Sequence, residues 1–419
     1  MKNSYICALD LGSSKIASGL AFFSKKGNIT NLILESVSSH GIKKGKILDP
    51  ADLSDAISKL LDNIKVKSGI NPTSLYVNIY GQDIITKHSR ATIPLAERGN
   101  KIITKTDIQK IVEEAKILDS SLEEEIIHQI PISFKVDEQD SIINPLGLYG
   151  HKLEVDFYLI CVKSSYIQNI NRLISHLGYE IKYLFLSGIA MSKVVFSEDL
   201  LKRGLNILCD IGSDITQICL FKDGVLHNLK VLPIGGDGLT NELAHTLKIP
   251  FELAEEIKKS YATIGEYKGP EDKQVMIKKD GNYSPISRRI ICEVITAGAN
   301  SLIQSVNNSV VEMAPQLENI DSLVVGGRTI LIDGFLEMME TTLGIPVRMI
   351  RFSDPGIFNT AKQEIIRSTP QFLNYATTLG IISEGIEATK GRQLFTPSSH
   401  RNPIRKLISR AKEIYQEYF

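Results

Sequence analysis

A short motif occurs twice in the chain, and this repeat limits the possible folds more than any other pattern in it. The copies are Leu9-Asp10-Leu11-Gly12-Ser13 and Cys209-Asp210-Ile211-Gly212-Ser213. Each copy lies at the end of an apolar strand-like run, which is the first strand of a predicted three-strand meander. Predicted helices follow each meander. Either copy alone fits an ordinary hairpin turn with a conformational glycine. Their matched positions favour a duplicated α/β unit instead.

The spacing of apolar residues predicts the elements around the two copies. Strands are expected over 5–11, 16–23, 32–37, 205–211, 215–222 and 225–232, and helices over 52–65, 239–264, 287–311 and 334–343. We therefore expect a first core subdomain (1–80 and 165–204) carrying an insert (81–164). A second core subdomain (205–236 and 318–387) carries a small subdomain (237–317), and a linker (388–402) leads to a final helix (403–419).

Composition narrows the class of protein. The chain has 419 residues, 48 Lys and Arg and 48 Asp and Glu, so it lacks the overall basic charge that favours nucleic acid. We expect no nucleic-acid partner. No signal peptide and no run long enough to cross a membrane is recognisable. The five scattered cysteines all lie in apolar segments, which favours free buried thiols in the cytoplasm.

The repeated turn suits a phosphate group. Neither a Walker loop nor a Gly-x-Gly-x-x-Gly motif is present, but a strand–glycine–strand turn gathers backbone N–H groups into a concavity that suits anionic oxygens. Candidate contributors from the two turns are Gly12, Ser13, Ser14, Lys15, Gly212, Ser213, Asp214 and Thr216. Asp10 and Asp210 are candidates to hold Mg²⁺ through its water shell. Two such turns facing each other would clamp a triphosphate.

Two further patterns extend this candidate site. Gly326-Gly327-Arg328 ends a predicted buried strand, where backbone without side chains lets a sugar and base lie flat. Glu255 and Lys258 lie three apart on a predicted helix and are candidates for ribose and adenine contacts, although such a pair is more often a surface ion pair.

The chain resembles the FtsA family of the actin/Hsp70-like superfamily. The resemblance rests mainly on three segments, 41–47, Asn144-Pro145-Leu146-Gly147 with the residues that follow to 154, and 235–244. It implies a duplicated actin-like (ribonuclease H-like) two-lobe α/β fold with an FtsA-type inserted subdomain. It also implies ATP and Mg²⁺ between the lobes, with Gly236 and Glu242 added to the residues named above.

The second turn departs from the family pattern Asp-x-Gly-Gly-Gly-Thr-x-Asp. Ser213 and Asp214 replace two glycines, Gln217 replaces the final Asp, and Ser187-Gly188 stands where a Glu or Gln before Pro is common. No general base for water is recognisable, so no catalytic residue is assigned. We predict ATP binding with little or no hydrolysis, and a structural adaptor rather than an enzyme.

The resemblance implies a peptide partner, the C-terminus of the tubulin-like FtsZ, on the small subdomain. Family members commonly carry Glu-x-x-x-x-Arg on a helix there, whereas this chain has Glu293 followed by Gly298. Lys278, Lys279, Arg288 and Arg289 are the alternative candidates for an acidic peptide, and a solvated charged face is the simpler interpretation.

The last segment predicts a basic amphipathic helix. Apolar and basic residues suited to a membrane surface are Ile404, Arg405, Lys406, Leu407, Ile408, Arg410, Ala411, Tyr415 and Phe419. A single such helix would bind an anionic membrane reversibly, and many on one filament would bind firmly. Docking of the helix on its own body or on a partner is the alternative.

Together these patterns predict an ATP-binding, self-polymerising adaptor that anchors the FtsZ ring on the cytoplasmic face of the membrane at the division site. Two alternatives stay open. A PilM-like pilus-assembly adaptor shares the insert but would not need the final helix for its location. A small-molecule kinase of the same superfamily would need a catalytic Asp and a substrate pocket.

Overall fold

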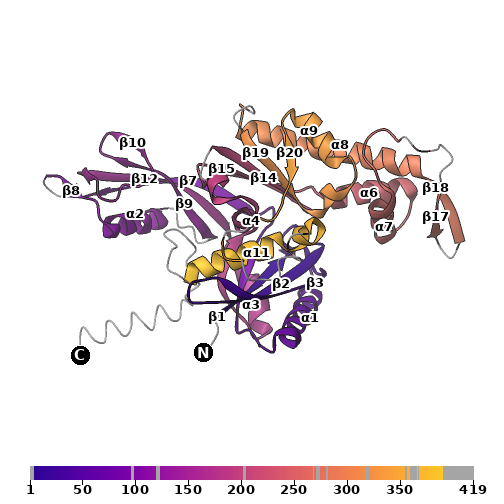
Figure 1. Cartoon of the computed structure of the whole chain (residues 1–419), viewed down its shortest axis with the longest axis horizontal. Coiled ribbons are helices and arrows are strands. Elements are labelled where there is room, and N and C mark those ends of the chain that lie inside the picture. The colour runs from indigo at the N-terminus through magenta and orange to yellow at the C-terminus, as the bar shows by residue number, and fades with distance from the viewer. Residues whose placement is uncertain are drawn as a thin grey trace.

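Two five-stranded mixed sheets of the same topology form the centre of the computed structural model (Figure 1). The structure describes residues 4–95, 99–118, 123–201, 204–267, 269, 274–279, 282–316, 320–353, 356–358, 366 and 368–389. The first sheet has the order β13-β6-β1-β2-β3, and the second has the equivalent order β20-β19-β14-β15-β16. In each, an antiparallel meander is extended by two parallel strands, so the predicted duplication is confirmed.

The strands of the first sheet are β1 (Ser4–Leu11), β2 (Lys15–Phe23), β3 (Ile29–Ser38), β6 (Ser74–Ile79) and β13 (Glu180–Leu186). Those of the second are β14 (Leu205–Ile211), β15 (Thr216–Lys222), β16 (Val225–Leu232), β19 (Ile320–Gly326) and β20 (Val347–Met349). Central strands such as β1 and β2 are buried on both faces and therefore read as continuous apolar runs. Leu11 pairs with Ile16 and Ile211 pairs with Thr216, so the two copies of the motif occupy equivalent turns.

Helices α1 (Pro50–Ser68) and α3 (Ser164–His176) pack against the first sheet. Helix α1 begins where the Asp49 side chain accepts hydrogen bonds from the N–H groups of Ala51 and Asp52, and it ends at Gly69 in the left-handed conformation. Its leucine and isoleucine stripe is buried against the sheet in one apolar cluster. These local signals explain why this helix was predictable from sequence.

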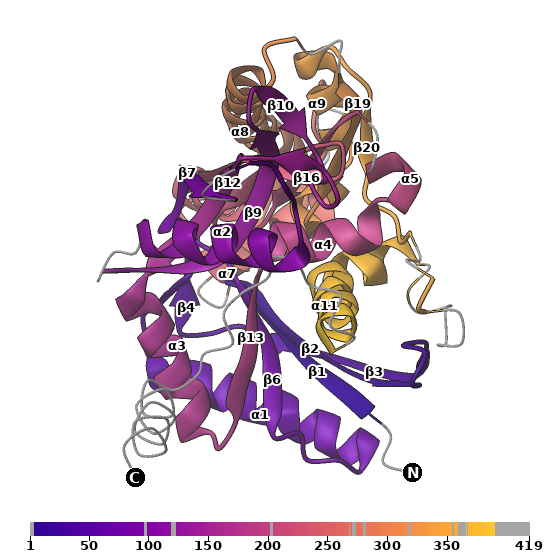
Figure 2. The same cartoon turned by 90° about the vertical axis from the view of Figure 1, so that its left-hand side faces the viewer.

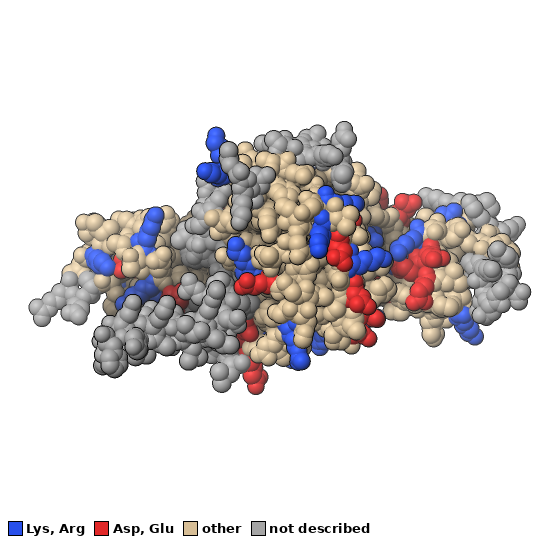
Figure 3. Space-filling view, turned by 90° about the horizontal axis from the view of Figure 1, so that it is seen from below, with Lys and Arg blue, Asp and Glu red and all other residues tan. Residues whose placement is uncertain are grey.

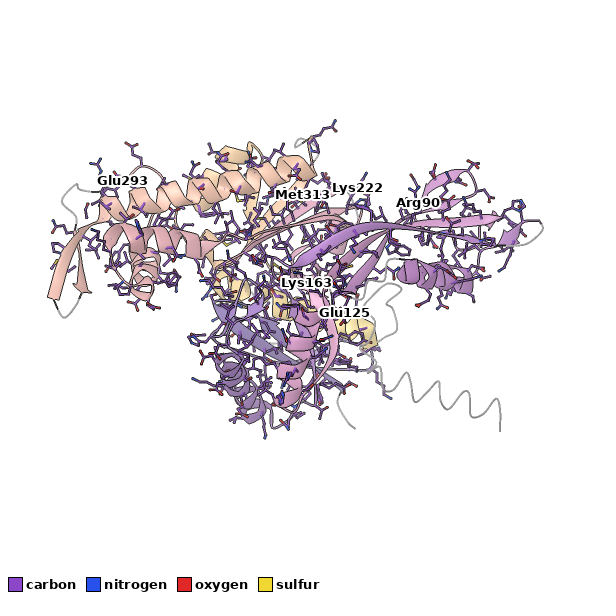
Figure 4. The ribbon with its side chains drawn as sticks, turned by 180° about the vertical axis from the view of Figure 1, so that it is seen from behind. Arg90, Glu125, Lys163, Lys222, Glu293 and Met313 are labelled. Atoms are coloured by element: carbon purple, nitrogen blue, oxygen red, sulfur yellow. The ribbon has the colours of Figure 1, made fainter. Side chains whose placement is uncertain are left out.

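The insert is a second α/β unit with its own apolar core. Strands β7 (Ile84–Pro94), β9 (Glu124–Val136), β10 (Gln139–Ile142) and β12 (Lys152–Lys163) form a sheet, with β8 (Lys101–Ile102) paired to β11 (Tyr149–Gly150) and helix α2 (Lys105–Leu118) alongside. Figure 1 shows it projecting from one end of the molecule. Glu125 and Lys163 mark its base and Arg90 lies farther out (Figure 4).

The opposite end is formed by helices of the second lobe. They are α6 (Gly236–Leu247), α7 (Phe251–Tyr261) and the long α8 (Arg288–Met313), with the hairpin of β17 (Gln274–Lys279) and β18 (Asn282–Ser287) beyond them. Figure 4 shows α8 running inward from Glu293 to Met313. The helical stretch expected over 239–264 consists of two helices, because left-handed Lys248 and then Pro250 separate α6 from α7.

Two helices, α4 (Ser187–Val195) and α11 (Thr369–Thr389), cross between the two lobes (Figure 2). At the crossing, a Cβ atom added to Gly380 would lie 2.0 Å from the backbone oxygen of Ala190. Only glycine permits this approach. The remaining short elements are β4 (Ile42–Lys43), β5 (Lys46–Ile47), α5 (Glu198–Leu201), η2 (Arg328–Leu331) and α9 (Phe335–Leu343).

Candidate functional site

The first turn brings Asp10 into a buried polar network. Asn78, on the neighbouring strand β6, donates from its amide nitrogen to Asp10 Oδ1 at 2.9 Å and to the Leu11 oxygen at 3.0 Å. Its amide oxygen accepts from the Leu11 nitrogen at 2.6 Å. Asn78 is fully buried, and sequence reasoning missed it. A lone Asn inside the apolar strand Ser74–Ile79 was the available signal.

Asp10 and Asp210 lie close enough for their charges to interact. Burial, followed by the charge of Asp10, raises the pKa of Asp210 to about 6, and Lys15 opposes that shift. Burial also raises the pKa of Asp10, against the attraction of Lys15, whose ammonium lies 3.6 Å from Asp10 Oδ2. Two neighbouring carboxylates of this kind repel each other until a cation compensates them. Their hard oxygen donors fit Mg²⁺ with its water shell.

The second turn is closed by backbone hydrogen bonds. The Gly212 nitrogen donates to the Ile215 oxygen at 2.9 Å. The first N–H groups of α6 approach the same turn, Gly236 donating to the Gly212 oxygen at 2.9 Å and Asp237 to the Ser213 oxygen at 2.6 Å. Gly236 therefore lies at this turn, and its N–H donates to the protein itself.

The glycine pair at the end of β19 packs against the second turn. Gly327 has φ +88°, and a Cβ atom there would lie 1.9 Å from the Ile211 oxygen. Position 327 therefore requires glycine because its backbone packs directly against the second turn. A Cβ atom on Gly326 would lie 3.5 Å from Asp210 Oδ1.

Two side chains connect the halves of the site. Arg328 Nη2 donates to Ser14 Oγ at 2.9 Å, joining the glycine-pair loop to the first turn. The Lys15 ammonium also donates to the Asn374 oxygen in α11. The two turns therefore belong to one connected site.

Glu255 and Lys258 form a buried cluster behind the second turn. Lys258 Nζ lies 2.6 Å from Glu255 Oε2, and it donates to Thr240 Oγ1 at 2.6 Å and to the Gly236 oxygen at 3.0 Å. Lys258 is 6% exposed, so the interpretation as a surface ion pair is wrong. Glu242 lies apart from this cluster and faces Gly298 in α8, where an added Cβ atom would be 2.5 Å from Glu242 Oε2.

Gln217 occupies the position where the family pattern has an acid. It pairs with Asp210 across β14 and β15 and is 3% exposed. Its carboxamide faces the start of α4, where an added Cβ atom on Gly188 would lie 2.6 Å from Gln217 Oε1. Both amide atoms are buried without a hydrogen-bond partner among the described residues. A neutral amide there is a poor general base.

Thr216, the last candidate of the second turn, is fully buried, and its hydroxyl donates to the Ile234 oxygen at 2.9 Å. Its hydroxyl is thus committed to the protein. Within the described ranges, no group of three or more His, Cys, Asp or Glu side chains is arranged as a metal site.

The candidate partner residues lie at the outer end of the second lobe. Arg289 is exposed and its Nε lies 2.7 Å from Glu293 Oε1, while Arg288 Nε donates to the Tyr261 oxygen at 3.2 Å. Lys278 and Lys279 belong to β17, and their side chains lie outside the described part of the structure. On the face seen in Figure 3, basic and acidic side chains are interspersed, in keeping with the neutral chain.

The candidate membrane residues, Ile404 to Phe419, lie outside the described residues. Among the described helices, none combines the length and the apolar character needed to cross a bilayer.

Two family models match the sequence. "SHS2 domain inserted in FTSA" matches residues 81–161, and "Cell division protein FtsA" matches residues 207–380. The cell division protein FtsA of Pseudomonas aeruginosa is 24% identical over 385 residues, covering 91% of this chain and 89% of the relative. That of Borreliella burgdorferi is 26% identical over 416 residues and covers 98% of each, and that of Escherichia coli K12 is 23% identical over 394 residues, covering 91% and 90%.

Solved structures share the fold at low sequence identity. The PilM–PilN type IV pilus biogenesis complex contains a chain with a TM-score of 0.63 and 16% identity, covering 92% of this chain and 99% of that one. MreB 5 of Spiroplasma citri bound to AMPPNP has a TM-score of 0.51 and 11% identity, covering 94% and 98%. These likenesses establish the actin-like two-lobe fold.

Proposed function

Because the chain belongs to the FtsA family of cell-division proteins, we propose that it is an ATP-binding adaptor that polymerises beneath the cytoplasmic membrane and anchors the FtsZ ring. Its actin-like cell-division role follows from the family. Nucleotide binding, membrane attachment, polymerisation and binding of the FtsZ peptide are our proposals.

The observation that supports nucleotide binding is that Asp10 and Asp210, at the ends of two equivalent strands, lie close enough for their charges to interact. Asp210 has a pKa of about 6 partly because Asp10 repels its charge, and bound Mg²⁺ would relieve that repulsion. Mg²⁺ would supply positive charge for the phosphate oxygens, with Asp10 and Asp210 holding its water shell. Ser13, Ser14 and Lys15 would contribute donors, and the cluster of Glu255, Lys258 and Thr240 would support the nucleoside side.

Isothermal titration of the full chain with ATP and Mg²⁺ tests this proposal. We expect saturable binding by the wild type and loss of at least tenfold in affinity for Asp10→Asn and Asp210→Asn when Mg²⁺ is present. Without Mg²⁺ the same variants should bind at least as well as the wild type, because they remove negative charge. Absence of wild-type binding would refute a nucleotide role.

We propose that hydrolysis is slow or absent. Gln217 stands where the family pattern has an Asp, and Ser187 stands where a Glu or Gln is common. The Gln217 side chain is not an ionisable proton acceptor. Turnover at an ordinary enzymatic rate, about 1–10³ per second, would contradict this. The control is Gln217→Asp, which restores the family residue and should raise any measured rate.

Membrane attachment is proposed for residues 403–419 on sequence alone. Their basic and apolar residues fit an interfacial helix, and anionic lipid contributes roughly 1 kcal/mol per basic residue. Co-sedimentation with anionic vesicles should be lost on deletion of 403–419 and reduced by Arg405→Glu with Lys406→Glu. Equal co-sedimentation of the full and shortened chains would refute the anchor.

The FtsZ peptide is proposed to bind at the outer end of the second lobe, near Arg288 and Arg289. Arg289 already pairs with Glu293, so an acidic peptide would compete with that carboxylate. Glu293→Gln should therefore strengthen peptide binding in fluorescence anisotropy, whereas Arg289→Ala should weaken it.

A further inference from the structure

The acid that departs from the family pattern, Asp214, contacts the other lobe. It lies in the second turn and is 4% exposed. Its Oδ2 accepts a hydrogen bond from the Lys44 nitrogen, on the tip of the hairpin formed by β4 and β5. Glycine at position 214 would make no such contact. The substitution that weakens the family pattern thus creates a link between lobes.

The same hairpin is wedged against the end of strand β6. Lys44 and Gly45 have φ values of +49° and +80°. A Cβ atom on Gly45 would lie 2.4 Å from the Tyr80 oxygen, and one on Gly81 would lie 2.9 Å from the Lys44 oxygen. Backbone therefore lies directly on backbone, with no room for a side chain between the hairpin and residues 80–81.

Tyr80 in turn contacts the first turn. Its hydroxyl lies 2.9 Å from Ser13 Oγ. One small unit, the hairpin with Tyr80, therefore touches both turns, Ser13 through the tyrosine and Asp214 through the Lys44 nitrogen. Lys46 continues this unit toward the insert, since its ammonium lies 3.1 Å from Asp83.

A small, partly open hollow lies beside the hairpin. It is lined on the hairpin side by Lys44 and Gly45 and on the insert side by Ile84 and Val162.

We propose that Asp214 is a positioning residue that fixes the spacing of the two turns through the hairpin β4–β5 before a nucleotide arrives. Its part in ligand affinity rests on the proposed nucleotide function, whereas the link itself does not. Asp214 is not a ligand of the phosphates in this proposal, because its carboxylate is turned to the Lys44 nitrogen.

The test compares Asp214→Ala with Asp214→Asn in the full chain. Both remove the charge, but only Asn keeps an acceptor oxygen. Hydrogen exchange of the nucleotide-free protein should be about tenfold faster at residues 42–47 in the Ala variant than in the Asn variant, the range expected for loss of one hydrogen bond. Equal exchange in the two variants would overturn the link.

Nucleotide affinity is measured on the same pair with ATP and Mg²⁺. We expect the Ala variant to bind about tenfold more weakly than the Asn variant. Equal affinities with unequal exchange would overturn the positioning role. If the wild type binds no nucleotide, the proposed function fails, and the exchange experiment still decides whether the link exists.

A second variant tests the proposal from the hairpin side. Gly45→Ala places a methyl group against the Tyr80 oxygen and should accelerate exchange at 42–47 as Asp214→Ala does. Gly69→Ala is the matched control, because Gly69 has a similar φ of +70° and no atom within 4 Å of an added Cβ. Equal effects of the two glycine variants at 42–47 would contradict the wedge.

Discussion

Asp210 illustrates how the burial of a single carboxylate affects the stability of the folded chain. Its pKa is raised from an ordinary value of 3.8 to about 6 in the folded chain, chiefly by burial. A raised carboxyl pKa means that the folded state binds the proton more tightly than the unfolded state. Its stabilising contribution is therefore present below about pH 4 and is lost as the pH rises through about 6.

The prediction is that Asp210→Asn stabilises the nucleotide-free protein at pH 7.5 but not at pH 4. At 1.36 kcal/mol per pKa unit, the gain at pH 7.5 is about 3 kcal/mol at most. Urea denaturation of both proteins at the two pH values, without Mg²⁺, measures it. Parallel stability–pH curves for wild type and variant would show that Asp210 is not the titrating group.

Tyr158 holds the insert to the second lobe. It lies in β12, is buried, and its hydroxyl accepts a hydrogen bond from the Leu229 nitrogen of β16 at 2.8 Å. On the first-lobe side, the buried His128 of β9 accepts from the Leu186 nitrogen at 2.8 Å through Nε2. Burial lowers the pKa of His128 to about 3, so it stays neutral and able to accept.

We predict that Tyr158→Phe lowers the free energy of unfolding by about 1–3 kcal/mol, because the Leu229 N–H loses its buried partner. The rate of backbone hydrogen exchange in β16 should also increase. Tyr149→Phe is the control, since Tyr149 is 65% exposed and its hydroxyl should be replaceable at little cost. Similar losses for both variants would mean that the Leu229 contact does not carry the effect.

Among the elements, the crossing of α4 and α11 leaves no room for added volume. Gly380→Ala places a methyl group 2.0 Å from the Ala190 oxygen, so the helices must separate. We predict a loss of about 1–3 kcal/mol or more, although alanine is the better helix former. Gly238→Ala in α6 meets no atom within 4 Å and should leave stability equal or improved. Thermal unfolding of the two variants decides the point.

Elements with strong local signals were predictable, and those held by distant contacts were not. The repeated turn and the capped helix α1 are determined by residues adjacent in the chain. The hairpin at 42–47 was not predicted, because its two-residue strands are held by Tyr80, Gly81 and Asp214 rather than by their own propensity. Strand β12 begins at Lys152, before its continuous apolar run from Phe157 to Val162, since pairing with β7 and β9 extends it over mixed residues.

The site was predictable as a set of turns but not as a network. Sequence placed Asp10, Asp210 and the glycines at strand ends. The fold brings Asp10 and Asp210 close enough for their charges to interact. Asn78, Thr240 and Tyr80 were missed, because each is a single polar residue with a site partner 15 or more positions away in the chain. Only the tertiary fold identifies such partners.

At the scale of the whole molecule, the insert and the small helices of the second lobe lie at opposite ends of the long axis (Figure 1). The outer insert exposes a group of large apolar side chains: Ile102, Ile143, Leu146, Leu148 and Tyr149. Head-to-tail contacts between unlike ends generate open filaments where the rotation does not close a ring. An exposed group of large apolar side chains is typical of a protein contact.

We therefore predict that Ile143→Asp raises the concentration needed for assembly on vesicles at least tenfold. Ile143 is 84% exposed, so the folded monomer should be unaffected. Val66→Asp is the control, because Val66 is 82% exposed on α1, away from the insert. Sedimentation and electron microscopy measure assembly, and equal assembly of the two variants would exclude the insert tip from the contact.

The crossing of α4 and α11 also limits how closely the two helices can approach each other. A Cβ atom at Gly380 would already overlap the Ala190 oxygen, so any closer approach would bring main-chain atoms into collision. The crossing therefore acts as a steric stop between the two helices.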